Sequence, residues 1–428
     1  MASYNIRRAT LVISLLGFFV RQAEAQQADL ADLYRRKEYF VLERQFEKQR
    51  AQLPDRLQLF YQAVLDNTFN RPAASDRQIK NIRSRFRIGP ANSLNKILLN
   101  LEADNATKLY DYRRAANTYQ LIIDQCKPDS AERADILNSL ALWGAIANVP
   151  PQAVVQRRDA SLKWRKDKIG LVQVPVHAGK DSCDLVFDTG ANLSVITETG
   201  AKKLHMQIYP VKLDLGAGTT GQTVQSSLAV ADSLYLGDVL LRHVVFLLLP
   251  DDMLYFKQAD YRQQGIIGLP LMVELGQINL YRDGRLVVPL HAERADGHNL
   301  ALDGLMPIVE YAFKRDHLPF RFDSGASSSA LYAPFYKRYQ EFIKQNGQPY
   351  ELKTGGVGGT INTAAAYQLK NVDFGVAGRA FRVPLINVRT TDVGQETDLF
   401  YGNMGLDIFG QFKQLTINFR YMYLQVLK

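Results

Sequence analysis

Two aspartates lie in nearly identical surroundings, and they are the residues best suited to do chemistry. Asp188 lies in the segment Leu-Val-Phe-Asp-Thr-Gly-Ala, and Asp323 lies in the later segment Phe-Arg-Phe-Asp-Ser-Gly-Ala. In each, an apolar strand delivers the aspartate into a turn, where a hydroxyl can hydrogen-bond and a glycine lets the backbone bend tightly. We take the turn-supporting residues to be Thr189, Gly190, Ser324 and Gly325.

One Asp-Thr-Gly tripeptide is typical of an ordinary turn, but here the flanking sequence is duplicated as well. A hairpin pattern precedes each aspartate, and a glycine-rich stretch, a further strand pair and an apolar-glycine segment follow it. Equivalent positions in the two copies are separated by almost the same number of residues. This holds between the two aspartates, between Gly268 and Gly405, and between the final strands, Ile278–Leu280 and Ile417–Phe419. This order of features predicts two copies of one β fold.

Two carboxylates held about 3 Å apart cannot both ionise easily, so they share one proton. The ionised member can take a proton from water while the protonated member donates to a carbonyl oxygen. Proton transfer of this kind typically contributes roughly 10²–10⁴-fold in rate. The pattern therefore predicts general acid–base catalysis of hydrolysis by Asp188 and Asp323.

Residues 169–428 resemble the aspartic protease superfamily, as two retropepsin-like lobes arranged in one chain as in the two-lobed pepsins. The resemblance implies that the two aspartate turns meet at a pseudo-twofold axis and are locked by the Thr189 and Ser324 hydroxyls. It implies an endopeptidase that needs no cofactor or metal and acts on peptides or proteins. Packing behind the site falls to Ile267, Gly268, Met404 and Gly405, and the flap candidates are Gly216, Gly218, Gly356 and Gly358.

Two positions depart from this symmetry, both beside the second aspartate. Asn403 stands where the first copy has Ile266, which predicts looser packing behind Asp323. Arg321 lies two positions before Asp323 and shares its face by strand alternation. An arginine so close is expected to depress the pKa values of the carboxyl pair.

Residues 1–25 form a different kind of segment. A basic start, an apolar run over residues 11–20 and an Ala-Glu-Ala cleavage site predict an export signal. The alternative is an uncleaved interfacial anchor, because Arg21 follows the apolar run closely. We expect an exported protein, periplasmic or secreted, with no membrane span after signal removal.

Residues 26–168 have apolar positions three and four apart, which predicts helices. In one of them Tyr112, Ala115, Ala116, Tyr119 and Ile122 share a face. The stretch resembles a tetratricopeptide repeat, and a plain helical bundle is the alternative. Pro150-Pro151 ends the helical pattern, and a basic connector over residues 157–168 leads to short strands.

The predicted fold class is therefore multidomain: an N-terminal α-helical domain, then an all-β, two-lobed, acid-protease-like domain. The expected segments are 1–25 signal peptide, 26–168 helical domain, 169–296 first lobe and 297–428 second lobe. The helical domain is either an inhibitory propeptide or, as we favour, a permanent domain that binds substrates or a protein partner.

The net charge is +9, and the excess lies in residues 26–170, which carry 25 Lys and Arg against 17 Asp and Glu. These charges are spread along helices, so no nucleic-acid groove is expected. The six histidines show no metal-ligand spacing. Spacing alone leaves open whether Cys126 and Cys183 pair.

Three other functions remain open at this point. The main one is a catalytically silent peptide-binding or scaffold protein on the same fold. A tetratricopeptide-like adaptor would have no need of duplicated aspartate turns. A sugar- or calcium-binding β protein would need more carboxylate or carbonyl ligands near Asp188 and Asp323 than the motifs supply.

Overall fold

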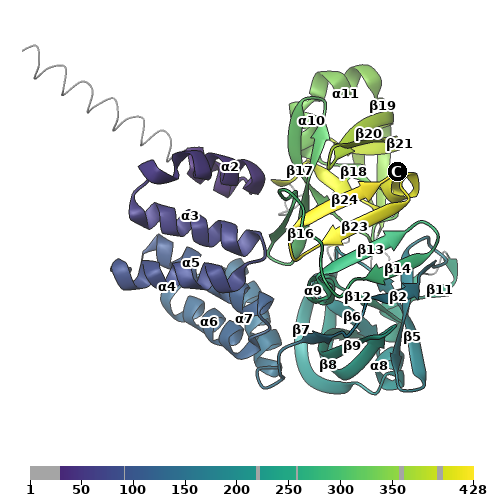
Figure 1. Cartoon of the computed structure of the whole chain (residues 1–428), viewed down its shortest axis with the longest axis horizontal. Coiled ribbons are helices and arrows are strands. Elements are labelled where there is room, and N and C mark those ends of the chain that lie inside the picture. The colour runs from purple at the N-terminus through teal and green to yellow at the C-terminus, as the bar shows by residue number, and fades with distance from the viewer. Residues whose placement is uncertain (1–28, 91, 218–221, 257–258, 356–360, 393–398) are drawn as a thin grey trace, which may run out of the picture.

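The computed structural model describes residues 29–428, except for 91, 218–221, 257–258, 356–360 and 393–398. A helical region comes first, and two β lobes lie beside it (Figure 1). This confirms the predicted order of a helical domain followed by a β domain. The helices are α2 (Tyr39–Gln49), α3 (Asp55–Thr68), α4 (Pro72–Arg85), α5 (Ser93–Lys108), α6 (Tyr112–Cys126) and α7 (Ser130–Ala145), with the 3-10 turn η1 (Arg50–Gln52).

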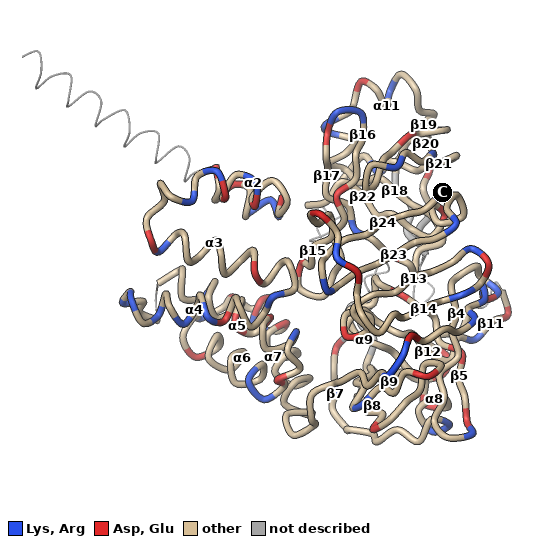
Figure 2. The backbone as a smooth tube through the Cα atoms, viewed as in Figure 1, with Lys and Arg blue, Asp and Glu red and all other residues tan. Residues whose placement is uncertain are grey.

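Local signals in the sequence explain where these helices begin. Asn92, Asp111 and Asp129 are N-caps whose side chains accept hydrogen bonds from the first-turn amides of α5, α6 and α7. The predicted face of α6 is buried, with Tyr119 only partly covered. Neighbouring helices stack in chain order, α3 on α4, α5 on α6 and α6 on α7. Lys and Arg alternate with Asp and Glu along this stack (Figure 2).

The first lobe is one large sheet in the order β1-β9-β6-β12-β5-β4-β8-β7, with β3 paired to β4. Its strands are β1 (Ala153–Val155), β3 (Arg165–Lys166), β4 (Val172–Ala178), β5 (Asp181–Phe187), β6 (Ser194–Thr197), β7 (Gln207–Ala217), β8 (Gln222–Leu236), β9 (Val239–Leu249) and β12 (Gly265–Ile267). Smaller elements complete it, namely α8 (Glu198–Lys203), η3 (Asp251–Leu254), β10 (Tyr255–Phe256), β11 (Tyr261–Arg262) and α9 (Leu269–Leu275).

The second lobe repeats this plan in a sheet of order β15-β16-β17-β22-β18-β21-β20-β19. Its strands are β15 (Leu300–Asp303), β16 (Met306–Phe313), β17 (Asp316–Phe322), β18 (Ala330–Leu331), β19 (Gln348–Gly355), β20 (Ile361–Val376), β21 (Arg379–Arg389) and β22 (Gly402–Met404). Its helices are α10 (Ala333–Arg338), α11 (Gln340–Asn346) and the 3-10 helix η6 (Leu406–Gln411). In both lobes the strand that ends at the aspartate pairs in parallel with the apolar-glycine strand, β5 with β12 and β17 with β22.

A third sheet joins the lobes, in the order β2-β14-β13-β23-β24. It consists of β2 (Ala160–Lys163), β13 (Gln277–Tyr281), β14 (Arg285–Val288), β23 (Gln414–Asn418) and β24 (Tyr423–Leu427). The predicted final strands of the two copies meet here, with Ile278 opposite Ile417. Both isoleucines are fully buried, and burying such a side chain contributes about 1.5–3 kcal/mol.

Strands begin earlier than the sequence pattern indicated. β1 precedes the connector of residues 157–168, and the connector itself forms β2 and β3, although we expected strands only from residue 169. β1 pairs with β9 in the first lobe, whereas β2 adds an edge to the shared sheet next to β14. Two basic residues of the connector form ion pairs, Arg158 with Asp238 and Arg165 with Asp184. The connector is therefore part of both β layers.

The helical region contacts both lobes. Trp143 and Leu142 of α7 share an apolar cluster with Leu213 and Leu228 of the β7–β8 hairpin. On the second lobe, the Asp303 carboxylate accepts hydrogen bonds from Lys37 Nζ at 2.7 Å and the Tyr39 hydroxyl at 2.6 Å. These contacts give the helices a fixed position against the β domain.

Two open points of the sequence are addressed by the structure. Cys126 and Cys183 are both free thiols, so they do not pair. Within residues 29–428, apart from the gaps given above, no helix is both long and apolar enough to cross a bilayer. The proposed signal segment lies outside the described residues.

Candidate active site

Each aspartate is fixed at the end of its strand by a backbone hydrogen bond to the neighbouring parallel strand. The Asp188 N–H donates to the carbonyl of Ile267, and the Asp323 N–H donates to that of Met404, both at 3.0 Å. The two lobes thus use the same bond at equivalent positions. Ile267 and Met404 are fully buried, as expected for residues that pack behind the site.

A serine in each lobe holds the apolar-glycine segment against the aspartate turn. The Gly268 N–H donates to Ser194 Oγ, and the Gly405 N–H donates to Ser329 Oγ, both at 3.0 Å. Any side chain at these glycines would collide with the turn, because a Cβ on Gly268 would lie 2.5 Å from the Leu193 backbone. Glycine is required here for close approach, as the sequence pattern predicted.

The two turns are joined to each other by four hydrogen bonds across the lobe boundary. Thr189 Oγ1 donates to the Phe322 carbonyl at 3.0 Å and accepts from the Ser324 N–H at 2.9 Å. Ser324 Oγ donates to the Phe187 carbonyl at 2.7 Å and accepts from the Thr189 N–H at 2.9 Å. Both side chains are fully buried, so water does not compete for these bonds.

This lock brings each aspartate against the glycine of the opposite turn. A Cβ on Gly190 would lie 2.5 Å from an Asp323 carboxyl oxygen, and one on Gly325 would collide with the Asp188 carboxyl. Each glycine N–H donates to the Oδ1 of the aspartate in its own turn, at 2.7 Å for Asp188 and 2.9 Å for Asp323. The two carboxyl groups therefore meet at the axis between the lobes.

Burial and the neighbouring Asp323 carboxylate raise the pKa of Asp188 from 3.8 to about 8. A hydrogen bond between the two carboxyls acts in the same direction, whereas the N–H groups of Gly190 and Gly325 partly offset it. The residue keeps some exposed surface, but its carboxyl lies deep enough for desolvation to be the largest effect. The raised pKa of Asp188 is the opposite of the depression that Arg321 led us to expect.

The surroundings of Asp323 differ from those of Asp188. The amide Nδ2 of Asn403 donates to an Asp323 carboxyl oxygen at 3.3 Å. Asn403 is buried, with 7% of its surface exposed. We expected looser packing there, and the structure instead places a polar contact to the carboxyl. Tyr332 and Arg389 also lie near Asp323. In the sequence, they could have been found only by comparing equivalent positions of the two copies.

The flap candidates fall only partly within the described residues. Gly216 pairs with Thr223 in the β7–β8 hairpin of the first lobe. Gly218, Gly356 and Gly358 lie outside the described residues. The first hairpin is anchored at Asp214, whose backbone N–H and carbonyl both bond to the Asn138 side chain of α7, at 2.9 and 3.0 Å. Sequence reasoning missed this contact, since nothing in the motif points to α7.

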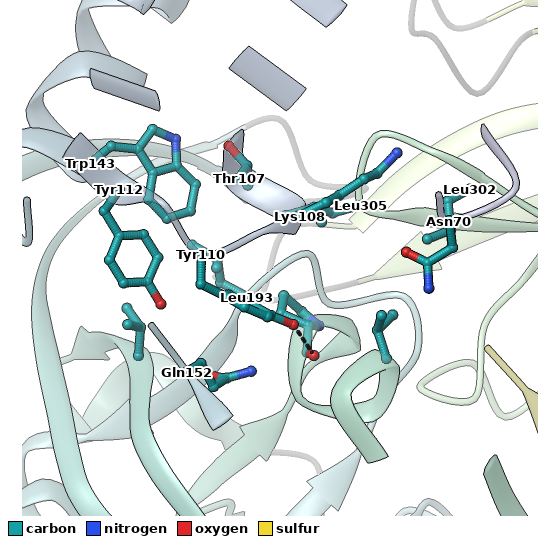
Figure 3. Close-up of a pocket in the computed structure, with 13 residues that line it drawn as sticks. Asn70, Thr107, Lys108, Tyr110, Tyr112, Trp143, Gln152, Leu193, Leu302 and Leu305 are labelled. Carbon is teal, nitrogen blue, oxygen red and sulfur yellow. Dashed lines mark hydrogen bonds between the residues drawn. The ribbon is translucent and has the colours of Figure 1, made fainter. Parts of the chain in front are cut away.

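A pocket lies where the helical region meets both lobes, and Tyr110, Leu193 and Leu302 are among its lining residues (Figure 3). Tyr112 stacks on Trp143 at one side, with ring centroids 5.6 Å apart. The Tyr110 hydroxyl donates to the Pro270 carbonyl at 2.8 Å. Leu193, in the loop after the turn, also lines this pocket. The helices therefore contact segments directly continuous with the turn.

In the described part of the chain, no three His, Cys, Asp or Glu side chains gather as a metal site.

The cross-lobe lock gives a prediction for stability. In Thr189→Val the side-chain shape is kept, but the Ser324 N–H and the Phe322 carbonyl lose their partner. Because each unpaired buried group costs about 1–3 kcal/mol, the free energy of unfolding should fall by about 2 kcal/mol or more. Denaturant unfolding measures this.

Thr390→Val is the matched control, because the Thr390 hydroxyl bonds the Ala365 carbonyl at an exposed position. Its effect should stay within about 0.5 kcal/mol. Equal stability of Thr189→Val and the wild-type protein would contradict the role given to the lock.

Comparison with known families agrees with this geometry. Residues 172–271 match the family model described as aspartyl protease. This span runs from β4 through Asp188 and Gly268 to the start of α9, and it is the first of the two copies. A search of curated proteins gave no significant match. Residues 172–271 are therefore similar to aspartyl proteases, and the second copy repeats the hydrogen bonds of this matched segment.

Proposed function

We propose that this protein is an aspartic endopeptidase in which Asp188 and Asp323 activate one water molecule. The observation that carries the proposal is the pair of cross-bonded turns, which brings two carboxyl groups together and raises the pKa of Asp188 to about 8. An ionised and a protonated carboxyl then coexist at one site. This is the state that acid–base hydrolysis of an amide requires.

The mechanism uses only these two groups and water. Asp323, as carboxylate, accepts a proton from water while the water oxygen attacks the scissile carbonyl carbon. Asp188 donates its proton to the carbonyl oxygen, which gives a neutral tetrahedral diol. Collapse then breaks the C–N bond, the amine nitrogen takes the proton held by Asp323, and a diol hydroxyl returns a proton to Asp188. No covalent intermediate forms.

The alternative is a silent peptide-binding protein on the same fold. The arrangement of the carboxyls favours the enzyme. Burying two neighbouring carboxyl groups makes their ionisation costly, and a binding protein has no use for such a pair. Both turns come from one chain, so a monomer is expected to hold a complete site.

The first test removes each carboxylate in turn. Asp188→Asn and Asp323→Asn should each reduce cleavage of an unfolded polypeptide by roughly 10³-fold or more, since neither amide can exchange the required proton. Folding should be retained, as checked by circular dichroism. Activity should persist in chelator and be inhibited by a statine-type peptide, as the family resemblance implies.

Asp283→Asn is the control, because Asp283 is an exposed carboxylate paired only with Arg285. It should cleave at the wild-type rate. Near-normal turnover in either active-site variant would rule out the shared-proton mechanism and favour the binding protein.

The raised pKa of Asp188 predicts the pH dependence of cleavage. Donation requires protonated Asp188, so kcat/KM should fall as the pH rises through about 8. Cleavage is therefore expected to extend to neutral pH. A pH profile on a peptide without titrating side chains measures this, and a descending limb centred well below neutral pH would contradict it.

We also propose that the protein is exported and that its helical region binds other molecules. The export proposal rests on residues 1–25, and the mass of the mature protein, with a start near Gln26, would test it. We also propose that the helical region is a permanent domain that binds substrates or a partner. Its contacts with Asp303 and with the β7–β8 hairpin support this over a propeptide. Autocleavage within residues 157–168 on acidification would favour the propeptide.

A further inference from the structure

Two arginines lie near Asp323, and within the described part of the chain neither pairs with a carboxylate. Arg321 of β17 lies near enough to the Tyr332 hydroxyl to offset part of the rise in its pKa that burial causes, and the Arg389 guanidinium lies 4.3 Å from the centroid of the same ring. Among the described residues, neither arginine forms an ion pair within 4.0 Å of an Asp or Glu oxygen, Asp323 included. Both guanidinium groups therefore lie near the Tyr332 side chain, and neither pairs with a carboxylate of the described residues.

Two polar atoms at this place also lack hydrogen-bond partners. Arg321 Nε and Asn403 Oδ1 are buried, and neither has a partner within the described part of the chain. Buried polar atoms are almost always paired. Since Arg321 and Asn403 lie opposite each other on β17 and β22, both unpaired atoms belong to the strands that carry the Asp323 turn.

The first lobe has no such cluster at the equivalent positions. Val186 stands where the second lobe has Arg321, and Ile266 where it has Asn403. The strand registers Ile196–Leu248 and Leu331–Val388 are equivalent, so Leu249 corresponds to Arg389. In the first lobe, Leu249 and Ile266 pack together with Val195 in an apolar cluster. The charge is therefore confined to the Asp323 side of the site.

We propose that Arg321 and Arg389 form a subsite that binds a substrate Asp or Glu side chain next to the scissile bond on the Asp323 side. This rests on the proposed peptidase function. A guanidinium binds a carboxylate through two parallel hydrogen bonds, and weak hydration suits it to partly buried ion pairs. Tyr332 lies near both guanidinium groups and holds Arg389 by a cation–π contact.

Asn403 separates the two negative charges that this arrangement brings together. Its Nδ2 already bonds the Asp323 carboxyl, and the N–H of Gly325 bonds the other oxygen of that group. Asp323 is thus held by neutral donors, which leaves the arginine charges for a second anion. A simpler role, in which the arginines act only on the acidity of the pair, predicts no preference among substrates.

The experiment compares peptides that differ only by Glu, Gln or Lys at each position flanking the scissile bond. The wild-type protein should show kcat/KM about tenfold or more higher for Glu than for Gln at one position, which corresponds to about 1.4 kcal/mol. Arg389→Gln and Arg321→Gln should each bring this ratio close to one. Arg389→Lys, which keeps the charge without the planar fork, should restore part of the ratio.

Arg379→Gln is the matched control, since Arg379 lies at the exposed opposite end of the same strand β21. It should keep the wild-type ratio. A wild-type ratio near one at every position would overturn the subsite, and so would arginine variants that shift the pH profile while the ratio stays the same.

Failure of the subsite can be told from failure of the proposed function. If no peptide is cleaved, the peptidase proposal fails, and the binding of the Glu and Gln peptides to the uncleaving protein still tests the subsite. Tighter binding of the Glu peptide that disappears in Arg389→Gln would support it, and equal binding of both peptides would overturn it. Equal cleavage of the Glu and Gln peptides would support the peptidase function and contradict the subsite.

Discussion

The crossed hydrogen bonds of Thr189 and Ser324 are the constraint on which the rest of the β domain depends. Each hydroxyl bonds both a backbone N–H and a carbonyl of the opposite strand–turn unit. Because all four bonds are buried, the two turns cannot move independently. Two carboxyl groups that would otherwise repel are thereby held together, and the cost appears as the raised pKa of Asp188.

The duplicated motif allowed much of this centre to be predicted, since repetition at a nearly constant offset is itself a structural constraint. The aspartates, the cross-bonding hydroxyls and the glycines behind them are all brought together as expected. The early strands were missed because β2 is a short edge strand in a basic segment, and its partner β14 lies beyond the whole first lobe in the chain, with Leu162 opposite Leu286. Short-range periodicity carries no signal of such a partner.

Side-chain effects on the site were harder to foresee than its backbone. Arg321 and Asn403 were visible as departures from symmetry, but their effects on the site depend on burial and on the other residues around them. The amide of Asn403 reaches Asp323, and the guanidinium of Arg321 turns to Tyr332 instead. Likewise, Asn138 meets Asp214 only because α7 packs on the β7–β8 hairpin. Contacts between domains of different class leave no shared pattern in sequence.

The shared sheet has a consequence for the order in which the chain can fold. Its strands come from both ends of the β domain, because β2 lies near the start of that domain while β23 and β24 end it. During synthesis, β13 has no partner on one side until residues 414–418 have been made. Contacts so distant in sequence slow folding. The shared sheet can therefore be completed only after nearly the whole second lobe has been made, whatever the state of the first-lobe sheet by then.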